Sequence, residues 1–81
     1  MATVVVMGEF RQYTGAVEEV EIEATSYRAA CRELAERFPV LTPEVFAKFS
    51  VSIDGELVHE PLLETFAEDS ELVFLPRIAA G

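Results

Sequence analysis

The sequence predicts an α+β domain in which a mixed sheet of about four or five strands packs on one long helix. Three observations lead to this prediction. Within residues 17–23, positions 19–23 alternate acidic and apolar side chains, with the period of a half-exposed strand. Residues 26–38 repeat apolar side chains with the period of an amphipathic helix. The segments near the two ends, residues 3–7 and 71–75, are almost continuously apolar, as central strands are.

The first two strands are predicted before residue 24. Residues 3–7 are β-branched and apolar, and Gly8 closes the run. In the second segment Val20 and Ile22 alternate with glutamates, so one face is expected to be wet. Gly15 lies between the two segments and suits a hairpin turn.

A change of period marks the long helix, which we expect over residues 26–38. Thr25 or Ser26 can cap its first turn, and Pro39 ends it. Charged side chains are expected on its outer side. The apolar stripe consists of Tyr27, Ala30, Cys31, Leu34 and Phe38. A buried thiol in apolar surroundings is inert, so Cys31 is interpreted as a small core residue rather than a nucleophile.

The second half of the chain holds shorter elements. Thr42 and Pro43 form a cap followed by a first-turn proline, which predicts a short helix to about residue 48. Asp54-Gly55 predicts a type I′ hairpin between residues 51–53 and 56–58. Residues 61–68 are expected to be irregular or a short helical turn, and residues 71–75 form the last strand. This order of elements is that of a β-grasp fold.

Length and composition limit the possible functions. With 81 residues the chain is expected to form one domain, residues 1–77, followed by a flexible tail, residues 78–81. A formal net charge of −9 argues against nucleic acid and anionic membranes as partners and suits a basic protein. The apolar N-terminal run has no basic segment and is too short to span a bilayer. One cysteine fits a reducing compartment, so we expect a cytoplasmic protein.

The outer face of the predicted sheet is unusually apolar. If alternate residues of the strands face the helix, their neighbours must face the other way. These neighbours are Val5, Met7, Val73 and Leu75. Four apolar side chains on adjacent strands form a patch that usually indicates a partner. The alternative is that the segments after residue 40 fold over this face.

The sequence contains no evident catalytic or metal-binding set. His59 is the only histidine and is expected at the surface. The nearby carboxylates Asp54, Glu56 and Glu60 are expected to form a solvated hairpin face rather than an acid–base pair. Arg11 and Arg77 are isolated cations that either contact a partner's carboxylate or phosphate or only keep the chain soluble.

Three segments carry a resemblance to a known family. They are residues 4–15, VVVMGEFRQYTG; residues 51–58, VSIDGELV; and residues 69–81, DSELVFLPRIAAG. Over its whole length the chain resembles the ubiquitin-like sulfur carriers, the small subunit of molybdopterin synthase (MoaD) and the thiamine sulfur carrier ThiS, and is most similar to MoaD. The last segment is the most specific, because the family pattern there is an acidic turn followed by EV-x-F-x-P-P-V-x-G-G.

The resemblance implies a function for the C-terminal residue. An adenylyltransferase of the MoeB or ThiF type would use ATP to adenylate Gly81, and sulfur would replace AMP to give a thiocarboxylate. The chain itself would bind no cofactor. With Ala79 and Ala80, Gly81 would enter a large synthase subunit of the MoaE type, which transfers the sulfur to a pterin precursor. The chain would therefore be the sulfur-carrying subunit of a sulfurtransferase rather than an enzyme by itself.

The same resemblance assigns the docking of both partners to the outer sheet face, where Met7, Leu57 and Leu75 match the family's apolar contacts. The chain departs from the family where Ala80-Gly81 replaces Gly-Gly, where Pro76-Arg77 replaces Pro-Pro and where Ser70 replaces a common glycine. A second class of function stays open: a β-grasp binding module or regulatory subunit that docks through its sheet without carrying sulfur.

Overall fold

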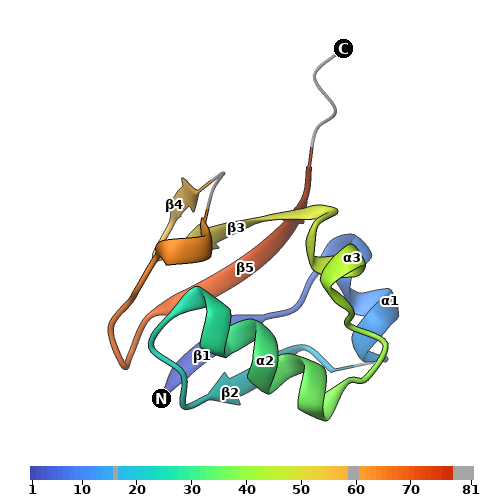
Figure 1. Cartoon of the computed structure of the whole chain (residues 1–81), viewed down its shortest axis with the longest axis horizontal. Coiled ribbons are helices and arrows are strands. Elements are labelled where there is room, and N and C mark those ends of the chain that lie inside the picture. Colours follow the sequence, from blue (N-terminus) through green and yellow to red (C-terminus); the bar gives the residue numbers. More distant parts are fainter. Residues whose placement is uncertain (16, 59–60, 78–81) are drawn as a thin grey trace.

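A computed structural model describes residues 1–15, 17–58 and 61–77 of the chain. The fold consists of five strands, several short helical segments and one longer helix (Figure 1). In chain order the elements are β1 (Ala2–Val5), η1 (Gly8–Phe10), α1 (Arg11–Thr14), β2 (Glu19–Ile22), α2 (Tyr27–Arg37), α3 (Pro43–Phe46), β3 (Phe49–Ile53), β4 (Glu56–Val58), η2 (Pro61–Leu63) and β5 (Glu71–Pro76). None of the helices among the described residues combines the length and apolarity needed to cross a membrane.

The five strands form one mixed sheet in the order β2-β1-β5-β3-β4. Strand β1 pairs antiparallel with β2 and parallel with β5, and β3 pairs antiparallel with both β5 and β4. The two most apolar strands, β1 and β5, lie inside the sheet, as their composition predicts. The architecture is that of a β-grasp fold, which confirms the predicted fold class.

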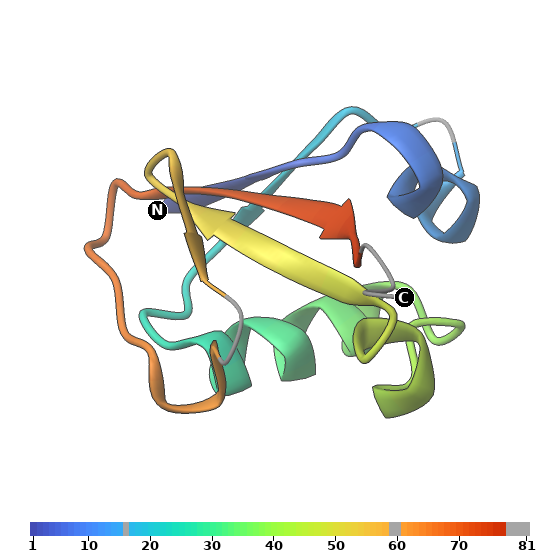
Figure 2. The same ribbon diagram turned by 90° about the horizontal axis from the view of Figure 1, so that it is seen from above.

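Helix α2 packs on one face of the sheet, which we call the inner face (Figure 2). The residues expected to face it are all buried: Val4, Val6, Val20, Ile22, Leu72 and Phe74. From the helix Tyr27, Ala30 and Leu34 are buried against them, whereas Cys31 and Phe38 are only partly buried. The core is therefore one layer of side chains between sheet and helix.

The helix ends and the second hairpin follow the local signals in the sequence. Ser26 caps α2, since its hydroxyl accepts a hydrogen bond of 3.2 Å from the Ala29 N–H. Thr42 caps α3 in the same way, with the Val45 N–H as donor at 3.3 Å. Asp54 and Gly55 have φ values of 52° and 84°, the positive values that a type I′ turn requires.

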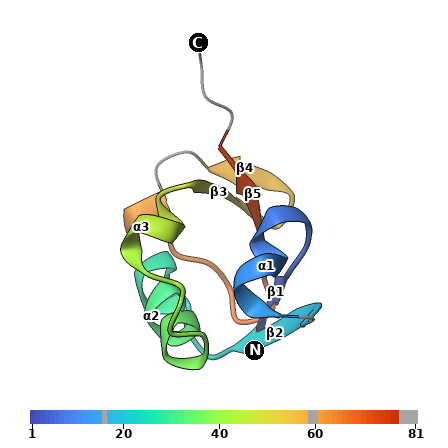
Figure 3. The ribbon, with the colours of Figure 1, turned by 90° about the vertical axis from the view of Figure 1, so that its right-hand side faces the viewer.

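Strands β1 and β2 pair antiparallel as expected, but their connection is longer than the turn predicted at Gly15. Strand β1 ends at Val5, and η1 and α1 fill the connection to β2 with helical turns. The reason is Phe10, which is fully buried and stacks on Phe74 with ring centroids 4.6 Å apart. These helical turns close one end of the core (Figure 3).

The short helical segments after residue 40, α3 and η2, lie on the inner side of the sheet together with α2 (Figures 2 and 3). Leu41 and Phe46 of the α3 region are buried in the core, and the Phe46 ring lies 5.7 Å from the Phe74 ring. The segment around η2 is tied to the start of α2, because the Tyr27 N–H donates to the Glu64 carbonyl at 3.0 Å. The alternative that these segments cover the outer face is therefore wrong.

Candidate functional site

The outer face of the sheet carries a row of side chains that runs across four strands. The strand register pairs Val5 with Val73, Val73 with Ser52, and Ser52 with Leu57. Paired residues point to the same side of a sheet, and their neighbours Val4 and Leu72 point into the core. The row therefore lies opposite α2, on the face that the alternation in the sequence predicts.

The apolar side chains of this face are partly or largely exposed, so a partner can reach them. Met7 and Leu57 are 46% and 49% exposed, and Val5, Val73 and Leu75 are partly buried by their neighbours in the sheet. We call these five residues the outer patch. Helices α2 and α3 lie on the inner face, whereas η1 and α1 lie at one end of the core (Figure 3). In the strand register Ser52 lies between Val73 and Leu57, so Leu57 is separated from the other apolar residues by one polar side chain. Apolar side chains gathered on one sheet face make this surface the candidate for a protein interaction.

Carboxylates border the outer patch on two sides. Glu19 is the β2 partner of Val5, and Glu21 is the partner of Thr3, which in turn pairs with Glu71 of β5. All three glutamates are exposed. A partner that covers the patch would satisfy them with basic side chains at its rim, in keeping with the net charge of −9.

A small polar cluster fixes the β3–β4 hairpin, and with it Leu57, relative to β5. The Ser70 hydroxyl donates to Asp54 Oδ2 at 2.7 Å, and the Glu71 N–H donates to Asp54 Oδ1 at 2.8 Å. Ser70 also accepts a bond of 2.9 Å from the Ala67 N–H and is buried. Ser70, which departs from the family pattern, thus has a structural role here. Both donors stabilise the carboxylate, so the pKa of Asp54 is lowered.

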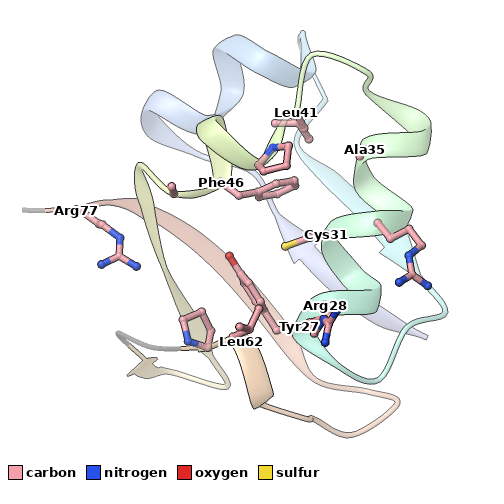
Figure 4. A pocket seen from close by; sticks show the side chains of 12 residues that line it. Tyr27, Arg28, Cys31, Ala35, Leu41, Phe46, Leu62 and Arg77 are labelled. Carbon is pink, nitrogen blue, oxygen red and sulfur yellow. The ribbon is translucent and has the colours of Figure 1, made fainter.

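The two predicted arginines lie outside the outer patch. Arg11, on α1, is 3.9 Å from Glu18 in an exposed ion pair. Arg77 follows β5, and its N–H donates to the Lys48 carbonyl at 3.0 Å. Its side chain lines a pocket on the inner side of the molecule rather than the outer face (Figure 4). The predicted tail residues Ala79, Ala80 and Gly81 lie outside the described residues.

Sequence reasoning missed this pocket, which has a volume of about 430 Å³ and opens between α2, α3, η2 and the end of β5. Cys31 lies at its wall, and desolvation by burial raises the pKa of the thiol to about 11. A neutral thiol fits the interpretation of Cys31 as a packing residue. Within the described part of the chain no group of three histidine, cysteine or acidic side chains could hold a metal ion. His59 and Glu60 lie outside the described residues.

Comparison with known proteins gives structural but no sequence-level matches. No protein-family model matches the chain, and no curated protein sequence matches it. The small archaeal modifier protein 1 of Methanosarcina acetivorans has a similar structure, with a TM-score of 0.75 and 16% identity over 99% of this chain and 95% of that one.

Two structures from Haloferax volcanii are also similar. Its small archaeal modifier protein 1 has a TM-score of 0.71 and 21% identity over 99% of this chain and 98% of that one. A further protein of the same organism, solved in solution, has a TM-score of 0.70 and 15% identity over 99% and 85% of the two chains. At these identities the likeness shows a shared ubiquitin-like β-grasp fold.

Proposed function

We propose that this chain is a ubiquitin-like carrier whose active form ends at Gly81, and that a partner enzyme activates the Gly81 carboxylate. The observation that carries the proposal is the position of the outer patch. It includes Val73 and Leu75 of β5, the strand that leads directly to residues 78–81. A protein bound to the patch is therefore near the residues after Arg77, and four residues can span at most about 14 Å.

The proposed activation is an adenylation. A carboxylate oxygen of Gly81 attacks the α-phosphorus of ATP, and pyrophosphate leaves. Hydrosulfide then attacks the carbonyl carbon of the acyl adenylate, and AMP leaves with one of the two original carboxylate oxygens. The product is a thiocarboxylate, and one proton is released. The chain contributes the carboxylate and the docking surface, whereas the activating enzyme of the MoeB or ThiF type contributes the ATP site.

The sequence resemblance and the structural likeness favour different acceptors for the activated carboxyl group. The resemblance to MoaD favours sulfur transfer to a pterin precursor in a large synthase subunit of the MoaE type. Two of the structural neighbours are named modifier proteins, which favours attack by a lysine amine of another protein on the same carbonyl carbon. Both reactions require the activated Gly81, so its adenylation is the central claim.

Each predicted site residue has a role in this proposal. The outer patch supplies the apolar centre of the interface with both partners. Arg11 contacts a carboxylate or phosphate of a partner at the end of the sheet, and Arg77 holds the start of the tail. Ala79 and Ala80 are small, so that a narrow channel admits them. The methyl group of Ala80 restricts the backbone more than glycine would.

The test is the intact mass of the chain after incubation with its activating enzyme, ATP and sulfide. We expect a mass gain equal to the difference between a sulfur and an oxygen atom. Deletion of Gly81 should abolish this gain but leave binding through the outer patch nearly unchanged, and Ala80→Gly should preserve or increase the rate. If neither the wild type nor Ala80→Gly gains mass or exchanges pyrophosphate with ATP, the chain is not a carrier.

The second candidate function is a binding module that uses the outer patch without activation of Gly81. The patch supports this function equally well, because docking requires no tail chemistry. A chain without Gly81 that still binds the partner, and that supports the partner's activity as well as the wild type does, would favour the binding module.

A further inference from the structure

The pocket between α2, α3 and η2 lies on the side of the molecule opposite the outer patch. Its walls are mostly apolar (Figure 4). The apolar lining residues are Ala35, Leu41, Pro43, Phe46, Ala47, Pro61 and Leu62. A pocket with a volume of about 430 Å³ has room for one or two large side chains.

The apolar surface continues beyond the pocket along η2. Leu62 is 61% exposed at the rim, and the next residue, Leu63, is 86% exposed. Two adjacent leucines in solvent next to an apolar pocket form a surface longer than the pocket itself. An extended segment of a partner would cover both, whereas a small molecule in the pocket would leave Leu63 in water.

The charges around the pocket all have one sign. Arg28, Arg32 and Arg77 line it, and among the described residues no acidic side chain does. The chain has only six lysines and arginines against fifteen acidic residues, so half of its cations gather here. Neither Arg28 nor Arg32 forms an ion pair with any residue that the structure describes.

The two helix arginines are arranged to contact one chain. Arg28 and Arg32 are four positions apart on α2, so their side chains project from the same side of the helix, about 6 Å apart at the Cβ atoms. Carboxylates on alternate residues of an extended peptide have a similar spacing of about 7 Å. The remaining polar side chains of the wall, Tyr27 and Cys31, are neutral at physiological pH, since the ordinary pKa values of a phenol and a thiol lie above it and burial raises both further.

We propose that this pocket binds an extended segment of a partner protein in which large apolar side chains are flanked by aspartate or glutamate. The apolar side chains would enter the pocket between Phe46 and Leu62, and the carboxylates would contact Arg28 and Arg32. The proposal is independent of the chemistry at Gly81. It gives the domain two separate faces, one for basic partners and one for acidic segments.

The test is selection of a phage-displayed library of random dodecapeptides on the full chain, followed by titration of the enriched peptide into ¹⁵N-labelled protein. The enriched peptides should combine leucine, isoleucine or phenylalanine with acidic residues, and should shift amide signals of α2 and α3. Arg28→Gln and Arg32→Gln should each weaken binding about twofold to fivefold, the range for one exposed ion pair.

A matched variant and a small carboxylate complete the test. Arg37→Gln also removes one positive charge from α2, but Arg37 does not line the pocket. This variant should therefore weaken peptide binding less than Arg28→Gln or Arg32→Gln does. Leu75→Glu, on the outer face, should also leave peptide binding unchanged. The proposal is overturned if no acidic–apolar peptide is enriched, if the shifts map to β1 and β5, or if octanoate binds the pocket more tightly than every selected peptide.

Discussion

Phe10 joins the β1–β2 connection to the core, and its replacement by alanine tests how much that connection stabilises the domain. The side chain is fully buried. Its ring stacks on Phe74 at 4.6 Å and meets the Phe49 ring edge-on at 5.2 Å. Phe10→Ala removes both aromatic pairs and leaves a cavity at the end of the sheet.

The expected loss is large for a domain of this size. Truncation of a buried phenylalanine to alanine costs about 3–5 kcal/mol, and the two aromatic pairs place Phe10 in the upper half of this range. The whole domain has about 4–12 kcal/mol of stability. We therefore expect Phe10→Ala to lower the free energy of unfolding by about 4 kcal/mol and to leave a substantial fraction unfolded at 37 °C.

Urea denaturation followed by far-ultraviolet circular dichroism measures this loss. Phe10→Leu keeps most of the volume and should cost less than about 1.5 kcal/mol. Leu63→Ala, at an exposed site, should change the stability by less than about 0.5 kcal/mol. A loss below about 1 kcal/mol for Phe10→Ala, with an unchanged dependence on urea, would refute the conclusion that this connection is part of the core.

Four further predictions concern the outer patch, the polar cluster and the thiol. Leu75→Glu should keep the fold but weaken binding of the activating enzyme about 30-fold, the effect of losing an interface hot spot, as measured by calorimetry. Ser70→Ala removes a buried hydroxyl that bonds Asp54 and Ala67, and should lower the stability by about 1–3 kcal/mol in urea denaturation. The folded-state pKa of Asp54 is lowered, so the ionised carboxylate stabilises the fold above its unfolded-state pKa. This stabilisation is lost as the pH falls through the folded-state pKa. The Asp54→Asn variant should therefore lose less stability in acid than the wild type loses. Cys31, with a pKa of about 11, should react slowly with a disulfide reagent at pH 8 and about tenfold faster for each pH unit up to that value.

The measurements on Leu75, Ser70 and Cys31 each have an outcome that would contradict the reasoning behind them. If Leu75→Glu binds the activating enzyme as tightly as the wild type does, the outer patch is not part of that interface. A Ser70→Ala variant as stable as the wild type would show that water replaces the hydroxyl. Fast labelling of Cys31 at pH 8, at a rate typical of an exposed thiol, would mean that its wall of the pocket opens in solution.

The sequence predicts most of the sheet and helix because their signals are local. Ser26 and Thr42 cap their helices through side chains three residues from the donors, and Asp54-Gly55 determines its own turn. The outward position of Val5 and Val73 follows from the period of two along each strand. Packing against distant residues is unnecessary for any of these features.

The features that could not be predicted depend on distant contacts. The helical turns of Gly8–Thr14 are too short for a periodic stripe, and they are stabilised by Phe10 against Phe74, at the other end of the chain. The pocket brings together Arg28, Arg32 and Arg77 from α2 and the end of β5. From the sequence, Arg28 and Arg32 are expected only as charges on the outer side of a helix. They become part of a pocket because η2 and α3 pack beside them in the fold.

The parallel pairing of β1 with β5 bears on how the protein is synthesised. Val4 pairs with Leu72, so the central pair of strands joins the beginning of the described fold to its end. Contacts of such large sequence separation slow folding, and the sheet cannot close before β5 has left the ribosome. The outer patch, which needs both strands, therefore exists only once β5 has been synthesised. A partner that recognises this patch would bind chains that include β5 and would not bind chains truncated before it.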